Sequence, residues 1–450
     1  MSQIINIKKG LDIRLKGKSD VVLSRPSMAD SYAIKPTDFH GVTPKLSVNI
    51  GDKVKAGAPL FFDKNNPKVL FTSPVSGEVV DVVRGERRKI LEVIVKADSE
   101  VEYQNFDITK GNFSAEEIKE LMLISGLWPS VIQRPYGIIA NAEDSPRDIF
   151  VSCFDSAPLA TDIDFIVKDE VESFTAGVKA LQKLTSGKVH FGLNADYQKD
   201  SLFTKIDGVE LHYFRGMHPA GNVGTQIHKV NPISKGDIVW TIAPQHIIML
   251  GRLLTKGIYD ASQIISLGGS EVKKTGYLKV ITGASISNLV ENNVNDENEL
   301  RYISGNVLTG KQISKDGFIG YYSNSINVIP EGRHFEFIGW ALPGLKKFSM
   351  SKTFFSWITP KKEYSLDTNL NGGDRAFVMS GQYEKVVPMD IYPVHLLKAI
   401  LAEDIDKMEQ LGIYEIIEED FALCEFVCTS KIDVQHIVRQ GLDLMVKELG

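Results

Sequence analysis

The residues best suited to redox or metal chemistry are three cysteines, Cys153, Cys424 and Cys428, of which the last two form a C-x₃-C pair near the C-terminus. Ferredoxin-type iron–sulfur clusters are commonly held by a C-x₂-C-x₂-C-x₃-C run. Counting back from Cys424 places Phe421 and Glu418 where two of the ligands would be. Because two thiolates cannot hold such a cluster, we predict that both cysteines are buried structural residues, a relic of a cluster motif, and that the chain binds no metal. A cluster shared with another chain stays open.

Glycine and histidine are concentrated in residues 215–228, RGMHPAGNVGTQIH. His218 and His228 lie ten residues apart with no carboxylate beside them in the sequence, a spacing that fixes no metal geometry. No strand-to-helix frame is evident around GNVGTQ, so we interpret this stretch as a structured turn. G-x-G-x-x-G, H-E-x-x-H and G-x-S-x-G motifs are absent, and the sequence assigns no catalytic residue.

Residues 48–83 alternate short strands with glycine-centred turns, which is typical of the small β-sandwich of carrier domains. Carrier domains present a modified lysine at a hairpin tip. The tip here reads DKNNPK, and Pro67 stiffens it. We therefore predict that Lys64 and Lys68 are solvated turn residues and carry neither biotin nor lipoate.

Composition narrows the function classes. The chain has 450 residues, 43% of them apolar and 24% charged, which suggests three or four globular domains. Its net charge of −6 argues against nucleic acid as a partner. Three cysteines fit a reducing compartment. No signal peptide is recognisable, and no apolar run approaches the ~20 residues of a membrane span.

Periodicity predicts an α/β multidomain chain. Residues 114–126 begin with a Ser114–Glu117 capping box and are predicted to form a helix. Strands at 149–153, 163–167 and 189–193 alternate with a helix at 170–184 and a last helix near 245–254, as in an α/β sheet. Residues 263–331 read as short strands with one helical piece near 286–291. Apolar spacing from Val394 to Leu411 predicts a helix that Gly412 ends, and another helix begins at Asp433.

The expected domains are a carrier-like β-sandwich with an N-terminal extension (1–101), a Rossmann-like α/β domain (102–255), a β-grasp domain (256–335), a connecting segment (336–390) and a C-terminal helical domain (391–450). Where a Gly-rich flavin loop would follow the first helix, the chain has Trp128, Arg134 and Tyr136, so the α/β domain is predicted to lack a flavin or nicotinamide site.

Several blocks in fixed order resemble one family over essentially the whole chain. They are IKKGLD (7–12), FDKNNPKVLFTSPVSGEV (62–79), RGERR (84–88), SGLW (125–128), DSAPLA (155–160), HPAGNVGTQIH (218–228), GDRAFVMSGQYEKVVPMDIYP (373–393) and LCEFVC (423–428). Together they resemble the NqrA family of sodium-translocating NADH:quinone reductases. That family looks related to the flavin-binding component of complex I and to the RnfC component of the Rnf complex, which keep the flavin loop and the cluster cysteines.

The resemblance implies a barrel-sandwich hybrid, an SLBB-like β-grasp domain and a ferredoxin-type module without its cluster. It implies a peripheral subunit on the cytoplasmic face of the bacterial inner membrane, bound to subunits B to F. In such a complex NADH oxidation and reduction of ubiquinone or menaquinone drive sodium export. The NADH, FAD, FMN, riboflavin and iron centres belong to the other subunits, and none is expected on this chain.

For the quinone-reduction step we predict two contact regions. Phe39 and His40 offer an aromatic ring and a protonatable imidazole that suit a quinone ring and its carbonyl. Trp128, Arg134 and Tyr136 occupy the position of the ancestral flavin loop. Local packing is the alternative for both regions.

Two other classes of function fit the same residues. One is a purely structural docking subunit without a ligand. The other is an electron-transfer protein like RnfC, which would carry iron and sulfide, and against which Glu418 and Phe421 argue.

Overall fold

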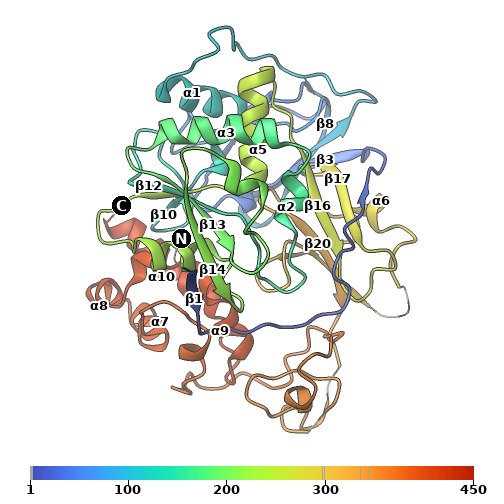
Figure 1. The fold of residues 1–450 in the computed structure, drawn as a ribbon. Coiled ribbons are helices and arrows are strands. Elements are labelled where there is room, and N and C mark those ends of the chain that lie inside the picture. The colour runs from blue at the N-terminus through green and yellow to red at the C-terminus, as the bar shows by residue number, and fades with distance from the viewer. Residues whose placement is uncertain (1–3, 296, 298, 335, 343, 450) are drawn as a thin grey trace.

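The structure is a computed structural model that describes residues 4–295, 297, 299–334, 336–342 and 344–449. In Figure 1 the α/β sheet occupies the centre, the N-terminal sandwich lies above and behind it, and the C-terminal helices lie below. The mixed sheet formed by residues 262–330 stands beside it. The other three units therefore lie around the α/β sheet.

The N-terminal sandwich consists of two small antiparallel sheets packed face to face. One sheet has the order β3-β9-β8-β5 and the other β4-β6-β7. Leu60, Phe61, Phe71, Val79 and Val93 from the two sheets are all buried members of one apolar core. The strands are β3 (Ser31–Ile34), β4 (Pro44–Leu46), β5 (Lys53–Val54), β6 (Pro59–Asp63), β7 (Leu70–Thr72), β8 (Gly77–Arg84) and β9 (Ile90–Ala97).

The predicted hairpin tip lies between β6 and β7. Asp63 closes it by accepting hydrogen bonds from the backbone N–H groups of Thr43 and Asn65, each at 3.1 Å. The Lys68 ammonium lies 3.1 Å from Glu143 and is 70% exposed. Hydrogen bonding of an Asp side chain to the backbone two residues later is typical of solvated turns. The ion pair between Lys68 and Glu143 connects this tip to the neighbouring α/β unit.

The N-terminal extension crosses to the other units before the sandwich begins. Strand β1 (Ile4–Ile7) pairs in parallel with β14 (Glu210–Gly216) at the edge of the α/β sheet. Strand β2 (Leu23–Ser24) pairs in parallel with β17 (Gly276–Ile281) at the edge of the mixed sheet. The first 24 residues therefore connect the sandwich to the α/β sheet and to the mixed sheet.

The α/β sheet has the strand order β1-β14-β13-β12-β15-β10-β11, in which the first five strands are parallel and the last two are antiparallel. The remaining strands are β10 (Ile132–Arg134), β11 (Ile138–Ile139), β12 (Asp148–Ser152), β13 (Val189–Asn194) and β15 (Val239–Thr241). Its helices are α1 (Ala115–Ser125), α2 (Ile163–Val167), α3 (Val171–Leu184), α4 (Val223–Val230) and α5 (Pro244–Lys256). The Ser114–Glu117 capping box is present at α1, as predicted.

Both faces of this sheet are covered. Ile149 and Val151 belong to the core shared with α3 and α5, whereas Phe150, between them, belongs to the core shared with the C-terminal helices. Helices α3 and α5 cross closely because Gly177 and Gly251 stand at the crossing; a Cβ on Gly251 would lie 1.7 Å from a carbonyl oxygen of α3. The sheet is therefore fixed from both sides.

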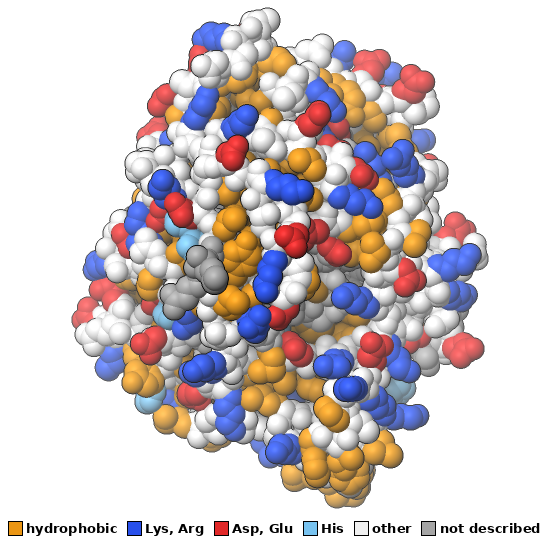
Figure 2. Space-filling model, in the orientation of Figure 1, with side chains coloured by type: hydrophobic (Ala, Val, Ile, Leu, Met, Phe, Trp, Pro, Cys, Tyr) orange, Lys and Arg blue, Asp and Glu red, His pale blue; other side chains and the backbone are white. Residues whose placement is uncertain are grey.

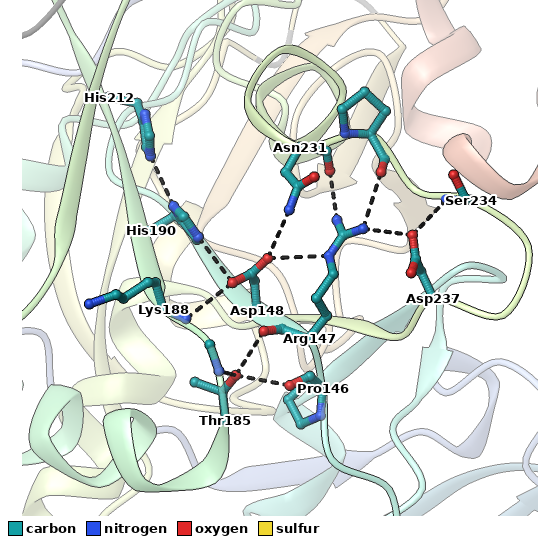
Figure 3. Close-up of polar contacts among 12 residues, drawn as sticks. Pro146, Arg147, Asp148, Thr185, Lys188, His190, His212, Asn231, Ser234 and Asp237 are labelled. Atoms are coloured by element: carbon teal, nitrogen blue, oxygen red, sulfur yellow. Dashed lines mark hydrogen bonds and ion pairs between the residues drawn. The ribbon is translucent and has the colours of Figure 1, made fainter.

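One polar network stabilises the amino-terminal ends of the central strands (Figure 3). Asp148 on β12 accepts from Lys188 N–H, from Asn231 and from Arg147, and its Oδ1 lies 3.3 Å from His190. His190 lies 2.9 Å from His212 on the next strand. Burial lowers the pKa of both histidines, so they are neutral at pH 7. The network ties β12, β13 and β14 together away from the cavity described below.

One predicted strand is wrong. Residues 163–167 form helix α2, which begins at Asp162, whose carboxylate accepts from Phe165 N–H at 3.1 Å. Four of its five residues are buried, and Ile163, Phe165 and Val167 alternate as they would on one face of a strand. Periodicity cannot separate a short buried helix from a buried strand, and the cap decides.

The mixed sheet has the order β19-β18-β20-β16-β17-β2, with β16 and β20 parallel at its centre. Its elements are β16 (Ser262–Gly268), β17, β18 (Leu300–Ser304), β19 (Lys311–Ile313), β20 (Ser325–Pro330) and α6 (Ser287–Val290). Among the described residues of 336–390, the regular elements are short 3₁₀ turns at Phe355–Ile358 and Tyr383–Lys385.

The C-terminal unit contains α7 (Pro393–Leu401), α8 (Ile405–Gln410), α9 (Ala422–Val427) and α10 (Val434–Leu449), with 3₁₀ turns at Ile413–Glu415 and Glu418–Phe421. The apolar spacing from Val394 to Leu411 predicted one helix, but the structure has two. Glu403 adopts a positive φ of 53°, and Asp404 caps α8 by accepting from Lys407 N–H at 3.1 Å. This cap starts a new helix, although the apolar spacing continues across the break.

Candidate functional site

A cavity of about 600 Å³ lies where the four units meet. The sandwich side contributes Lys35, Asp38 and His40, and the mixed sheet contributes Ser304, Lys311, Tyr321 and Tyr322. The α/β unit contributes Arg134, Ser152, Asp155, Asn222, Thr241 and His246, and the C-terminal unit contributes Glu418, Glu419 and Arg439. No single unit could form this cavity alone.

The cavity lies at the carboxyl ends of β12 and β15. Ser152 is the last residue of β12, and Phe154 and Asp155 follow it. Thr241 is the last residue of β15, and Pro244 follows it. From β12 the chain continues to β13 and β14 on one side, whereas β15 lies on the other side. Open α/β sheets bind ligands at such a point of reversal, so the topology itself marks this cavity as the candidate ligand site.

Two of the predicted contact residues, His40 and Arg134, both line the cavity although they are far apart in the sequence. The Nε2 atom of His40 lies 2.7 Å from Asp443 Oδ1 on α10. The Arg134 side chain is only 1% exposed. The structure therefore places one residue from each predicted contact region in the lining of the same cavity.

The other three predicted residues, Phe39, Trp128 and Tyr136, are not among the residues that line the cavity. Phe39 is buried, with its ring centroid 4.5 Å from Phe71 and 4.9 Å from Tyr321. Trp128 is fully buried, and its Nε1–H donates to the Ala140 carbonyl at 2.8 Å.

Tyr136 packs with its ring centroid 6.2 Å from that of Tyr414 in the C-terminal unit. Its backbone carbonyl accepts from Arg439 at 2.9 Å. Phe39 supports an aromatic residue of the lining, whereas Trp128 and Tyr136 take part in packing, the alternative foreseen for them.

The GNVGTQ stretch is more than a turn, contrary to the sequence interpretation. It links strand β14 to helix α4, and Gly221, Asn222 and Val223 line the cavity at the start of that helix. The frame was missed because β14 carries few buried residues and its alternation is weak.

The Arg134–Asp420 ion pair occupies the space beside this helix start. Arg134 Nη1 donates to Asp420 Oδ2 at 2.8 Å, and both side chains are 1% exposed. A Cβ on Gly224 would lie 2.4 Å from Asp420 Oδ1 and 2.6 Å from Arg134 Nη1. A helix N-terminus attracts anions, and here a carboxylate of the chain itself lies in that position.

An aromatic wall faces the cavity from the opposite side. The rings of His246 and Tyr321 stack with centroids 5.2 Å apart and an interplanar angle of 15°. Tyr322 donates its hydroxyl to the Pro129 carbonyl at 2.7 Å. Burial lowers the pKa of His246 to about 4 and raises the pKa values of both tyrosines, so all three are neutral at pH 7. This wall suits a flat, uncharged ring.

Charged side chains line the remaining wall. Burial lowers the pKa of Lys35, whose Nζ donates to the Phe318 carbonyl at 2.8 Å. Burial also raises the pKa of Asp155. Desolvation raises the pKa of Glu419 to about 7, against the lowering effect of Arg134, whose Nη2 lies 2.6 Å away. A carboxyl with this pKa exchanges a proton close to neutral pH.

Cys424 and Cys428 lie outside the cavity lining. Cys424 and Cys428 are buried in the apolar core of the C-terminal unit, and Tyr383 donates its hydroxyl to Cys428 Sγ at 2.9 Å. At the two positions where a cluster would need ligands, Glu418 pairs with Arg439 and Phe421 is buried in the same core. Among the described residues, no group of three or more His, Cys, Asp or Glu side chains is arranged to hold a metal ion.

His228 does have a carboxylate partner, which sequence neighbours did not reveal. Its Nδ1 lies 2.6 Å from Glu415, and its Nε2 accepts from Asp390 N–H at 2.9 Å. His218 lies with its Nδ1 3.0 Å from the Ser156 hydroxyl. His228 therefore connects α4 to the C-terminal part of the chain, whereas His218 contacts Ser156 within the α/β unit.

Three family descriptions match consecutive parts of the chain. The NqrA N-terminal barrel-sandwich hybrid domain matches residues 5–98, the NqrA second alpha/beta domain matches 113–259, and the NQRA C-terminal domain matches 264–315. Curated relatives agree over the whole length. The NqrA protein of the Na(+)-translocating NADH-quinone reductase of Rhodopirellula baltica is 37% identical, with 99% of this chain and 98% of the relative covered.

The chain belongs to the NqrA family. Relatives with the same name from Pasteurella multocida and Neisseria meningitidis are also 37% identical and cover 99% of this chain and 100% of their own. The family resemblance seen in the sequence blocks is thereby confirmed. So are the barrel-sandwich domain and the α/β domain that follows it.

The NqrA-family name denotes one subunit of an enzyme complex, the Na(+)-translocating NADH-quinone reductase. None of the described helices has both the length and the apolar character required to cross a membrane. Among solved structures, an NAD+-reducing [NiFe]-hydrogenase in its air-oxidized state is similar with a TM-score of 0.40 and 11% identity, covering 74% of this chain and 62% of that chain.

Proposed function

We propose that this chain contributes to the quinone-reduction step of a sodium-translocating NADH:quinone reductase by holding a quinone head group in the cavity between its four units. The observation that carries the proposal is the convergence of His40, Arg134 and the His246–Tyr321 wall on one cavity at the switch point of the sheet. A quinone head group is flat and carries two carbonyl acceptors, which match a stacked wall opposed by donors.

In this proposal each side of the cavity has a separate task. His246 and Tyr321 contact the ring face. His40 and Lys311 donate hydrogen bonds to the carbonyl oxygens from the rim; Lys311 is 60% exposed and is oriented by Asp38 at 3.2 Å. Glu419, whose pKa lies near 7, supplies or accepts a proton as the ring changes its oxidation state.

The proposal gives this chain no flavin, nicotinamide or iron centre of its own. The Asp420 carboxylate beside Gly224 would repel a phosphate at the start of α4, and Arg134 is already paired there. The NADH-, flavin- and iron-dependent steps, the contacts with subunits B to F and the position on the cytoplasmic face are parts of the same proposal. They follow from the family and not from this cavity.

The test is a calorimetric titration of the purified chain with a short-chain ubiquinone. His40→Ala and Lys311→Met are expected to weaken binding about tenfold each, because each removes one hydrogen bond to the ligand. Matched controls are His436→Ala, an exposed histidine outside the cavity lining, and Lys68→Met, another exposed ion-paired lysine. Both controls are expected to bind as the unaltered chain does.

Equal affinity in all four variants, or no binding by the unaltered chain, would refute the quinone site. The second result would favour the alternative of a docking subunit without a ligand. In the assembled complex, the same two cavity variants are expected to raise KM for quinone more than they lower kcat, because they act on ring binding.

A further inference from the structure

The described residues of 333–379 form a surface segment that exposes far more apolar side chains than its surroundings. We call its exposed residues the amphiphilic patch. The exposed large side chains of the patch include Phe337 (75%), Leu345 (62%), Ile358 (56%), Trp357 (54%) and Trp340 (51%). Figure 2 shows hydrophobic side chains gathered at the lower tip of the molecule, where Figure 1 places this segment. Apolar exposure of this density marks an interaction surface.

The charge of the segment is opposite to that of the chain. Residues 333–379 contain seven Lys and Arg but four Asp and Glu, whereas the whole chain carries −6. Lys346, Lys352, Lys361 and Lys362 are exposed, and blue side chains border the hydrophobic tip in Figure 2. Lys362 also lies over the ring of Tyr364, 5.1 Å from its centroid. Exposed lysines are therefore interspersed with aromatic rings.

We propose that the amphiphilic patch binds the surface of a membrane that contains anionic lipid. Tryptophan rings favour the headgroup region of a bilayer, and nearby lysines are attracted to anionic headgroups. A protein partner is favoured less, because lysine is depleted in protein–protein interfaces and is abundant here. The patch would hold the chain against the lipid surface without a membrane-spanning helix.

The native tryptophans make this proposal directly measurable. The chain has four, of which Trp128 and Trp240 are fully buried, while Trp340 and Trp357 lie in the patch. Only the two patch tryptophans can change their surroundings when the folded chain meets a vesicle. A shift of the fluorescence spectrum to shorter wavelength therefore reports on the patch.

The experiment mixes the full chain with vesicles of phosphatidylethanolamine and phosphatidylglycerol, and separately with vesicles of phosphatidylcholine alone. We expect flotation with the anionic vesicles together with the spectral shift, and little of either with phosphatidylcholine. Raising the salt from about 50 to about 500 mM is expected to weaken binding, because it shortens the range of the lysine–headgroup attraction. Absence of both flotation and shift overturns the proposal and leaves the patch as a surface for a protein partner.

Variants localise the effect. Lys361→Gln with Lys362→Gln is expected to lower vesicle affinity on the order of tenfold. The control is Val21→Ser with Val22→Ser, two side chains that are each 61% exposed but lie outside the patch. Trp357→Phe is expected to keep most of the affinity and to lose part of the spectral shift. Equal loss of affinity in the lysine variant and the valine control would overturn the assignment to the patch.

Discussion

Replacing Arg134 by Met is expected to destabilise the packing of the C-terminal unit against the α/β sheet. Arg134 ends strand β10, and its guanidinium bonds Asp420 at 2.8 Å and Glu419 at 2.6 Å, both in the 3₁₀ turn before α9. Methionine keeps the apolar stem but removes the charge. Asp420 would then keep only the hydrogen bond that its carboxylate accepts from Ile417 N–H at 3.0 Å.

The expected loss in the free energy of unfolding follows from how deeply each carboxylate partner of Arg134 is buried. Asp420 is 1% exposed, and removing the cation from such a buried pair costs about 3–5 kcal/mol. Desolvation of Glu419 offsets most of its attraction to Arg134, so this partner adds little to the loss. Asp420→Asn in the same chain removes the uncompensated charge, and the double variant is expected to recover at least about 2 kcal/mol of that loss.

The assay is urea unfolding of the single and double variants, followed by circular dichroism. Amide hydrogen exchange would show whether protection is lost first in α4 and α9. The control is Lys68→Met, which removes an ion pair of similar length, 3.1 Å, whose partners are 70% and 76% exposed. Its expected effect is under about 1 kcal/mol. If Arg134→Met costs no more than this control, or if the two substitutions are additive, the buried pair does not hold the units together as argued.

Two further predictions concern stability. Burial lowers the pKa values of His218 and His246 to about 4, below the ordinary value of 6.5 that they regain on unfolding. The unfolded chain therefore binds protons more readily, and stability is complete above pH 6.5 and falls as the pH drops toward 4. Each histidine contributes a loss of about 2 kcal/mol at pH 5, which urea unfolding at pH 7 and pH 5 measures. Because the raised pKa of Glu419 acts in the opposite direction, the loss is read as the difference between the unaltered chain and the variants His218→Gln and His246→Gln. The same pH dependence in the unaltered chain and in both variants would contradict the burial of the two rings. Separately, Gly251→Ala is expected to cost about 3 kcal/mol or more, because its Cβ would lie 1.7 Å from a carbonyl oxygen of α3. Gly373→Ala, where nothing lies within 4 Å of the Cβ, is the control, and equal melting temperatures of the two variants would contradict the close crossing of α3 and α5.

Local signals predicted much of the fold. The capping box at Ser114 and Glu117 was read directly from the sequence, and the strand at 189–193 is present as β13. The errors occurred where local signals compete. At 163–167 a short apolar pattern that also fits a strand hid a helix, whose cap, Asp162, was overlooked. Between α7 and α8 the cap at Asp404 broke a regular apolar pattern.

The candidate site was predictable only in part. His40 and Arg134 were selected from separate segments for their chemistry, and both line the cavity. The His246–Tyr321 wall was missed because it joins α5 to the mixed sheet, and no short-range pattern links residues 75 positions apart. The start of α4 was missed because the weak alternation of β14 concealed the strand before it.

The sequence by itself determined the family and the order of the units, because several blocks of residues keep their types and order along the whole chain. It also located most of the helices, because apolar residues that recur every three or four positions are a local pattern. Only the tertiary structure decided that β1 and β2 leave the sandwich, that Asp420 lies at the start of α4, and that four units enclose one cavity. These features depend on contacts between residues that are distant in the chain, and burial and charge pairing set such contacts only once the units have packed.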